Sequence, residues 1–217
     1  VVPQGGNTGL VGGQMPRPGK GEIVVSLARL NKIRSLDTVG QTMIVEAGVV
    51  LQRAQLAASE AGLLFPLSLG SQGSCQIGGN LSSNAGGTGV LAYGNMRNLC
   101  LGIEAVLPDG ETWNGLRSLG VITAAVLKLF SAPRGNETIY AGVDSPETAL
   151  KLFRLAQDYC GPSLTGFELM PRIGIEFTTR HIEGVRDPLT EPHPWYVLID
   201  ISSGQSQDAA RAMLEGL

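Results

Sequence analysis

The sequence is short of charged residues and of long apolar runs. Asp, Glu, Lys and Arg make up 16% of the 217 residues, against about 25% in an average soluble domain. The net charge is −3, which argues against a nucleic-acid groove, because such a groove needs an excess of Lys and Arg. No apolar run approaches the roughly 20 residues of a membrane-spanning helix. With 43% hydrophobic residues, the chain is predicted to be a folded globular protein and not a disordered coil.

Cysteine and histidine are scarce as well. The three cysteines, Cys75, Cys100 and Cys160, are scattered and odd in number, which does not fit a disulfide framework and is consistent with a reducing compartment. The two histidines, His181 and His193, have no His, Asp or Glu at the spacing that a zinc site needs. We therefore expect no metal site in this segment.

Glycine, in contrast, is abundant: there are 30 glycines, and they gather in two uncharged stretches. The first stretch is 1–16, with five glycines, and the second is 61–96, with nine. Apolar residues are interleaved through the second stretch, which a flexible linker would not need. Glycine lets backbone N–H groups approach a ligand closely, so a phosphate can be held without Lys or Arg. The two stretches predict a nucleotide-like ligand bound by backbone donors.

The common nucleotide-binding motifs are absent. No Gly-x-Gly-x-x-Gly sequence occurs, and the run Gly13–Lys20, which comes near a Walker A motif, is followed by Gly21 where Ser or Thr is required. A Rossmann domain and a P-loop NTPase are therefore disfavoured.

The hydrophobic periodicity predicts an α+β protein in two parts. In the first part we expect a helix over 51–61 and strands over 22–27, 42–47, 99–107, 111–113 and 121–130. In the second part, helices are expected over 146–159, 173–181 and from 207 onward, alternating with strands over 137–143, 163–169 and 195–202. The predicted domains are 1–132 and 133–217. The chain begins at the edge of a glycine loop and ends inside an amphipathic helix, so we expect it to be part of a longer protein.

The glycine stretches resemble those of a known fold. Pro3–Gly13 is similar to the pyrophosphate loop of the vanillyl-alcohol-oxidase-type (PCMH-type) FAD-binding fold, and Pro66–Asn80 with Asn84–Gly87 is similar to its second flavin-binding segment. Within that superfamily the chain most resembles the FAD-linked D-2-hydroxyacid dehydrogenases, and among them the D-2-hydroxyglutarate dehydrogenases. Phe167–Met170 and Pro194–Ile199 resemble parts of their substrate domain.

The resemblance implies a fold in which a PCMH-type FAD-binding domain, lacking its N-terminal part, is followed by part of an α+β substrate (cap) domain. Relatives carry a longer stretch before Val121, so we expect a gap in the sequence at 119/120. The resemblance also implies cofactor-binding residues, which are Pro3, Gln4, Gly5, Gly6, Asn7, Thr8, Gly9, Leu10, Pro66, Gly70, Ser71, Gly73, Ser74, Gly78, Gly79, Asn80, Ser83, Asn84, Gly86, Gly87, Val121 and Ile122.

The implied reaction is FAD-dependent oxidation of a D-2-hydroxy acid, D-2-hydroxyglutarate first, to the 2-oxo acid, with hydride passing to flavin N5. The catalytic residues and a divalent metal site are expected in the absent C-terminal half. The FAD is expected to be non-covalent, because the first glycine loop has no histidine. The implied electron acceptor is an electron-transfer flavoprotein or a quinone, and analogy allows a homodimer. The expected location is cytoplasmic, or mitochondrial in a eukaryote.

Two alternatives remain open from the sequence. One keeps the fold and changes the substrate to D-lactate or glycolate. The other is a non-catalytic module that binds a nucleotide or a partner.

Overall fold

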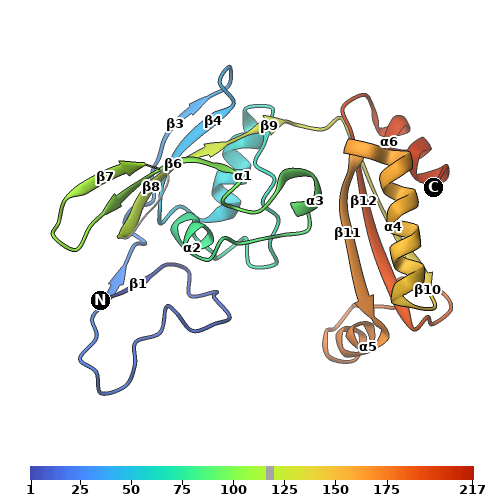
Figure 1. The fold of residues 1–217 in the computed structure, drawn as a ribbon, viewed down its shortest axis with the longest axis horizontal. Coiled ribbons are helices and arrows are strands. Elements are labelled where there is room, and N and C mark those ends of the chain that lie inside the picture. The colour runs from blue at the N-terminus through green and yellow to red at the C-terminus, as the bar shows by residue number, and fades with distance from the viewer. Residues whose placement is uncertain (116–119) are drawn as a thin grey trace. The chain divides into compact units, whose positions relative to one another are not determined.

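A computed structural model describes residues 1–115 and 120–217 and divides into two compact units (Figure 1). The first unit comprises Val1–Gly87 and Tyr93–Ala132, and the second comprises Thr88–Ala92 and Pro133–Leu217. The expected junction at 119/120 involves residues 116–119, which lie outside the described residues.

The first unit is built on an antiparallel five-stranded sheet with the strand order β3-β4-β8-β6-β7. Along β4, Met43 and Val45 are fully buried, whereas Ile44 between them is only half-buried. This alternation gives the sheet one core face and one open face. The strands are β3 (Ile33–Asp37), β4 (Thr42–Glu46), β6 (Cys100–Val106), β7 (Thr112–Gly115) and β8 (Val121–Lys128).

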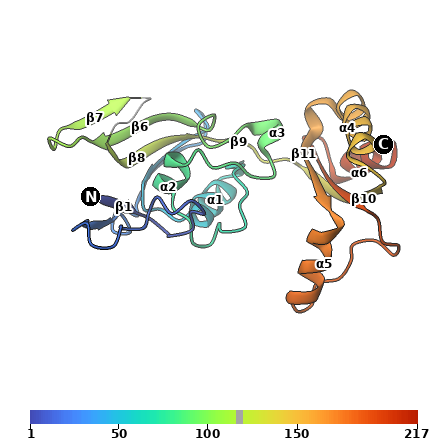
Figure 2. The ribbon, with the colours of Figure 1, turned by 60° about the horizontal axis from the view of Figure 1, so that its bottom comes forward.

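Helices α1 (Leu51–Glu60) and α2 (Ile77–Ser82) cover the core face of this sheet (Figure 2). The predicted stop of α1 is confirmed, because Gly62 follows the helix with a φ of +72°, in the left-handed region that glycine tolerates best. The prediction of one strand over 121–130 is wrong. β8 ends at Lys128, and the chain then forms β9 (Phe130–Ser131), which pairs with β5 (Leu63–Leu64) and not with β4.

Several short elements were not expected from the sequence. β1 (Val2–Gln4) pairs in parallel with β2 (Val24–Ser26), which is shorter than the strand predicted over 22–27. β3 was not expected either. α2 and α3 (Val90–Tyr93) form inside the second glycine stretch. α2 contains two glycines, and glycine is a poor helix former, so tertiary contacts have overridden the local preference in α2.

The second unit is a three-stranded antiparallel sheet of order β10-β12-β11. Its strands are β10 (Gly135–Val143), β11 (Leu164–Pro171) and β12 (Trp195–Ser203). Helices α4 (Pro146–Cys160) and α6 (Gln207–Glu215) pack on one face, and α5 (Arg172–His181) follows β11 directly. The predicted start of α4 is confirmed, because Ser145 accepts a hydrogen bond from the Thr148 N–H and Pro146 is the first helical residue.

No helix among the described residues is long and apolar enough to cross a bilayer.

Candidate functional site

The first glycine loop leaves the end of β1 and is held open by two glutamines. The Gln4 side chain donates to the Gln14 carbonyl at 3.0 Å, and the Gln14 side chain donates to the Gly9 carbonyl at 2.8 Å. Asn7 adopts a φ of +56°, which Asn tolerates better than most residues. These features give the loop a defined shape although most of it is exposed.

The loop carries a row of free backbone donors. Within the described residues, no N–H group from Gly5 to Gly13 donates a hydrogen bond. The Thr8 hydroxyl also lacks a partner there. Successive unpaired N–H groups beside glycine form a concave surface that favours an anion.

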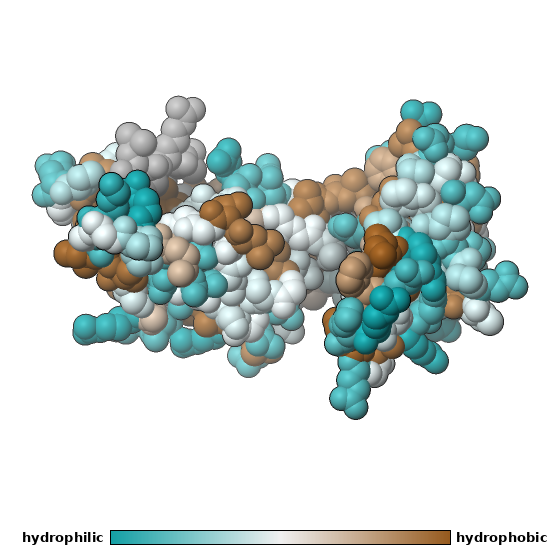
Figure 3. Space-filling view, turned by 90° about the horizontal axis from the view of Figure 1, so that it is seen from below, coloured by the Kyte–Doolittle hydropathy of each residue, from teal (hydrophilic) through white to brown (hydrophobic). Residues whose placement is uncertain are grey.

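The second glycine segment lies directly against this loop. A Cβ on Gly6 would lie 1.9 Å from the Ser74 carbonyl oxygen, so only glycine allows this approach. A Cβ on Gly5 would lie 3.0 Å from Gln76 Oε1. The two uncharged stretches, some 60 residues apart in the sequence, therefore form one surface in the first unit. Much of the face of that unit drawn in Figure 3 has the pale colour of intermediate hydropathy, which is the hydropathy of glycine, serine and threonine.

Backbone hydrogen bonds join the second segment to the start of α1 and to Ala47, the residue after β4. The N–H groups of Leu51 and Gln52 donate to the carbonyls of Cys75 and Gln72 at 2.9 and 3.0 Å. The Gly78 N–H donates to the Ala47 carbonyl at 2.8 Å, and a Cβ on Gly78 would lie 2.8 Å from the Ala47 Cβ. Gly78 thus serves the packing of α2 on β4, and its N–H is already used.

Other donors of this segment stay free. Within the described residues, the N–H groups of Gly70, Ser71, Gly73 and Gly79 have no hydrogen-bond partner. All four residues are exposed or half-buried. They extend the row of donors that begins in the first loop.

The end of the segment is held by internal hydrogen bonds. The Ser83 hydroxyl donates to the Gly79 carbonyl at 2.9 Å, and the Asn84 side chain accepts from the Arg97 N–H at 2.9 Å. A Cβ on Gly87 would lie 2.3 Å from the Ser68 carbonyl oxygen. Ser83, Asn84 and Gly87 therefore stabilise the conformation of the segment. Gly86, which lies between Asn84 and Gly87 in the sequence, is half-buried.

The remaining predicted residues lie around this surface. Pro3 and Gln4 belong to β1, Leu10 is fully exposed at the loop tip, and Pro66 is buried. Val121 and Ile122 begin β8 and are half-buried. The backbone carbonyl of the next residue, Thr123, accepts a hydrogen bond from the Ala47 N–H at 2.8 Å. This bond links the start of β8 to Ala47, whose own carbonyl accepts the Gly78 N–H.

Two buried side-chain amides lie in the second segment, and only one of them was predicted as a site residue. Gln76 Oε1 and Asn80 Oδ1 are buried and have no hydrogen-bond partner among the described residues. Asn80 was predicted as a site residue, and Gln76 was not. Gln76 stands among the glycines of the second segment, but no signal in the sequence marks its oxygen as unpaired.

A charged cluster that the sequence did not reveal joins four strands of the sheet. The Arg34 guanidinium donates to both oxygens of Glu104 at 3.0 and 3.2 Å and to Glu46 at 3.3 Å. Hydrogen bonds from Arg34 and from the Thr123 hydroxyl lower the pKa of Glu104, against the opposing effect of burial. A hydrogen bond from the Lys32 N–H and a weaker one from Arg34 lower the pKa of Glu46.

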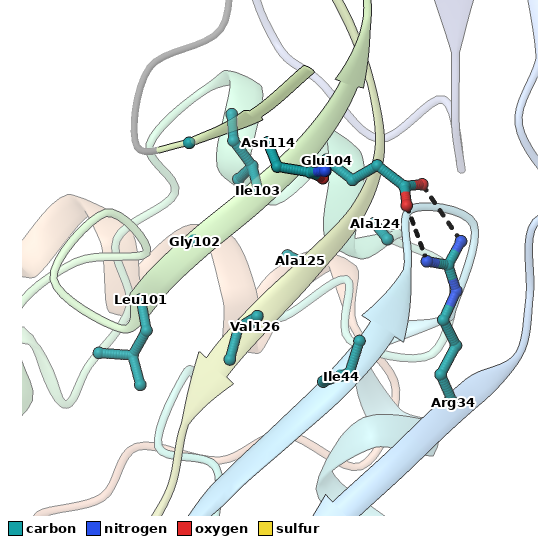
Figure 4. A pocket seen from close by; sticks show the side chains of 11 residues that line it. Arg34, Ile44, Leu101, Gly102, Ile103, Glu104, Asn114, Ala124, Ala125 and Val126 are labelled. Carbon is teal, nitrogen blue, oxygen red and sulfur yellow. Dashed lines mark hydrogen bonds and ion pairs between the residues drawn. The ribbon is translucent and has the colours of Figure 1, made fainter. Parts of the chain in front are cut away.

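This cluster borders a hollow of about 340 Å³ on the open face of the sheet (Figure 4). Ile44, Val126 and Leu101 supply its apolar walls, and Gly102 leaves space between them. Among the described residues, the charged side chains that line it are Arg34 and Glu104, and these neutralise each other. None of the predicted site residues lines this hollow, so we do not place the cofactor here.

In the second unit, Arg172 is engaged by its neighbours. Its guanidinium donates to Asp187, to the Tyr196 hydroxyl at 2.5 Å and to Glu176 at 3.0 Å. Hydrogen bonding to Asp187 and then Glu176 raises the pKa of Arg172. This arrangement joins α5, β12 and the segment between them, and leaves Arg172 with a structural role.

The described residues contain no group of three or more His, Cys, Asp or Glu side chains that could hold a metal ion.

FAD, in contrast, fits the glycine surface. Its pyrophosphate needs many hydrogen-bond donors, and the two segments offer free N–H groups without a carboxylate among them. Its hydroxyl and N–H groups need acceptors, and two buried amide oxygens lack a partner.

The comparisons with known proteins point to the same cofactor. A family model described as an FAD binding domain matches residues 1–115. The chain is 35% identical to a D-2-hydroxyglutarate–pyruvate transhydrogenase of Saccharomyces cerevisiae, over 95% of this chain and 45% of that protein. It is 36% identical to the mitochondrial D-2-hydroxyglutarate dehydrogenase of Bos taurus, over 97% of this chain and 42% of that protein. The chain thus spans less than half the length of these relatives.

The solved structure of alkyldihydroxyacetonephosphate synthase superposes with a TM-score of 0.77, covering 99% of this chain and 44% of that one at 16% identity. At this identity the likeness shows the fold alone. It supports the predicted α+β fold.

Proposed function

Because the chain belongs to the FAD binding domain family, we propose that the whole protein oxidises a D-2-hydroxy acid, D-2-hydroxyglutarate first, to the 2-oxo acid. One observation supports the cofactor's place in particular: two segments rich in free N–H groups meet at Gly6 and Ser74. The substrate class rests on the relatives, whose names include D-2-hydroxyglutarate dehydrogenase.

In this proposal the pyrophosphate is bound by the first loop. The N–H groups of Gly5, Gly6 and Gly9, with the side chains of Asn7 and Thr8, would donate to its oxygens. Gly70, Ser71, Gly73, Ser74 and Gly79 would complete the surface from the second segment. The other predicted site residues fix the shape of the two segments or extend them, and they are Pro3, Gln4, Leu10, Pro66, Gly78, Asn80, Ser83, Asn84, Gly86, Gly87, Val121 and Ile122.

FAD, when bound, supplies the acceptor for the hydride removed from the hydroxy acid. The residues of this chain bind and orient it through uncharged groups. Neither glycine stretch contains a histidine, so we propose that the FAD is non-covalent and can be removed.

The partners of the reaction follow from the same resemblance. We propose an electron-transfer flavoprotein or a quinone as electron acceptor, and a homodimer as the assembly. Relatives are named mitochondrial, which supports that location if the source is eukaryotic.

The substrate is tested by anaerobic reduction of the flavin in the full-length protein. D-2-hydroxyglutarate should bleach the flavin absorption band at about 450 nm, and L-2-hydroxyglutarate should not. D-lactate, D-malate and glycolate serve as competing substrates in the same assay. Faster bleaching by D-lactate or glycolate would contradict the proposed substrate, and a flavin that none of these acids reduces would contradict the proposed reaction class.

A further inference from the structure

Gln76 and Asn80 present buried acceptors that the protein itself does not satisfy. Gln76 Oε1 and Asn80 Oδ1 have no hydrogen-bond partner among the described residues, and Asn80 as a whole is only 5% exposed. Native proteins pair nearly all their buried polar atoms, so each exception calls for a reason.

Both amides belong to the glycine surface. Gln76 precedes the first residue of α2, and its carbonyl accepts the Asn80 N–H at 3.0 Å, so the two residues are neighbours at the start of this helix. Gln76 Oε1 lies 3.0 Å from the position that a Cβ on Gly5 would take. The Gln76 amide is therefore next to the first residue of the glycine loop.

We infer that Gln76 Oε1 and Asn80 Oδ1 accept hydrogen bonds from hydroxyl or N–H groups of bound FAD and do not face its phosphate oxygens. This inference rests on the proposed FAD site. Phosphate oxygens at neutral pH are acceptors, so they cannot satisfy an acceptor oxygen. They match the free N–H groups of the first loop instead. The ribityl chain, the isoalloxazine N3–H and the adenosine end all carry suitable donors.

The test uses the full-length protein with Gln76→Leu and, separately, Asn80→Leu. Titration of each apoprotein with FAD, followed by quenching of flavin fluorescence, should show a Kd raised about tenfold, the loss expected for one hydrogen bond in a dry site. The melting temperature of each apoprotein should stay equal or rise, because an unpaired buried acceptor has been removed. Gln205→Leu, an exposed glutamine of the second unit, is the matched control and should change neither quantity.

Two further ligands, ADP and 3-methyl-FAD, identify which group of FAD donates the hydrogen bond. ADP carries adenosine and both phosphates but no flavin or ribityl group. If the variants bind ADP as the wild type does, the donor belongs to the flavin half, and 3-methyl-FAD then separates N3–H from the ribityl hydroxyls. If ADP affinity falls as much as FAD affinity, the donor belongs to the adenosine half. Either result supports the inference.

The inference is overturned by unchanged FAD affinity in both variants. If Gln76→Leu fails to fold, Asn80→Leu decides by the same measurements. A wild-type protein that binds no FAD at all would contradict the proposed function itself, whereas wild-type binding with unaffected variants contradicts this inference alone.

Discussion

Gly6 is the residue at which the two glycine segments meet. A Cβ there would lie 1.9 Å from the Ser74 carbonyl oxygen, whereas a Cβ on Gly13, in the same loop, would have no atom within 4 Å. We expect Gly6→Ala to lower the free energy of unfolding by about 1–3 kcal/mol, as overpacking does, and to weaken FAD binding. Gly13→Ala should change both by little. Urea denaturation and FAD titration measure the two effects, and equal behaviour of the two variants would contradict the contact.

At this scale the sequence could predict which glycines matter but not why. Gly6 and Gly78 both belong to glycine-rich motifs. The absence of a Cβ lets Gly6 approach the Ser74 carbonyl and lets Gly78 approach the Ala47 side chain. Gln76 could not be distinguished from other amides in the sequence, because its significance is an unpaired oxygen that only burial creates. Residues that bind through the backbone leave a pattern of glycine, whereas a single buried acceptor leaves none.

At the scale of elements, the Arg34 cluster ties β3, β4, β6 and β8 together at one end of the sheet. Because the folded-state pKa of Glu104 lies below its ordinary value of 4.5, its contribution to stability is present above that pH and is lost as the pH falls through the lowered pKa. At pH 7 we expect Glu104→Gln to cost about 0.5–1 kcal/mol, since both partners are partly exposed.

Urea denaturation of Glu104→Gln and wild type at several pH values checks this prediction. The difference between them should be largest near neutral pH and should shrink in acid. Glu111→Gln is the control, because Glu111 is exposed and its side chain makes no hydrogen bond or ion pair with another described residue. A difference that persists unchanged into acid would contradict the role of the Glu104 charge.

The long elements could be predicted, whereas several short ones could not. α4 has a capping serine, a proline at its first position and a glycine after its end, and β12 alternates buried and half-buried residues along most of its length, so their local signals agree with their environment. α2 contains two glycines in six residues and forms because β4 and α1 hold its first N–H groups and its preceding loop. β1 is three residues long, too short for a periodic pattern, whereas β2 was predicted as a longer strand than the three residues that it has.

At the scale of the whole molecule, the first unit brings together two segments that the sequence separates by some 60 residues. The sequence predicted that both would bind one cofactor, but their direct contact depends on the course of the chain through β3, β4 and α1. The charge deficit of the sequence has its physical reason here, because a surface that binds a diphosphate with backbone N–H groups needs few ionised side chains.

The visible absorption spectrum of the purified full-length protein shows whether these two segments bind FAD. We expect a yellow protein with a flavin absorption band at about 450 nm. The band should be lost on mild unfolding and should return when FAD is added back. Gly6→Ala should regain less of the band at the same FAD concentration. A wild-type protein that is colourless as purified and stays colourless with excess FAD would contradict FAD binding by these segments.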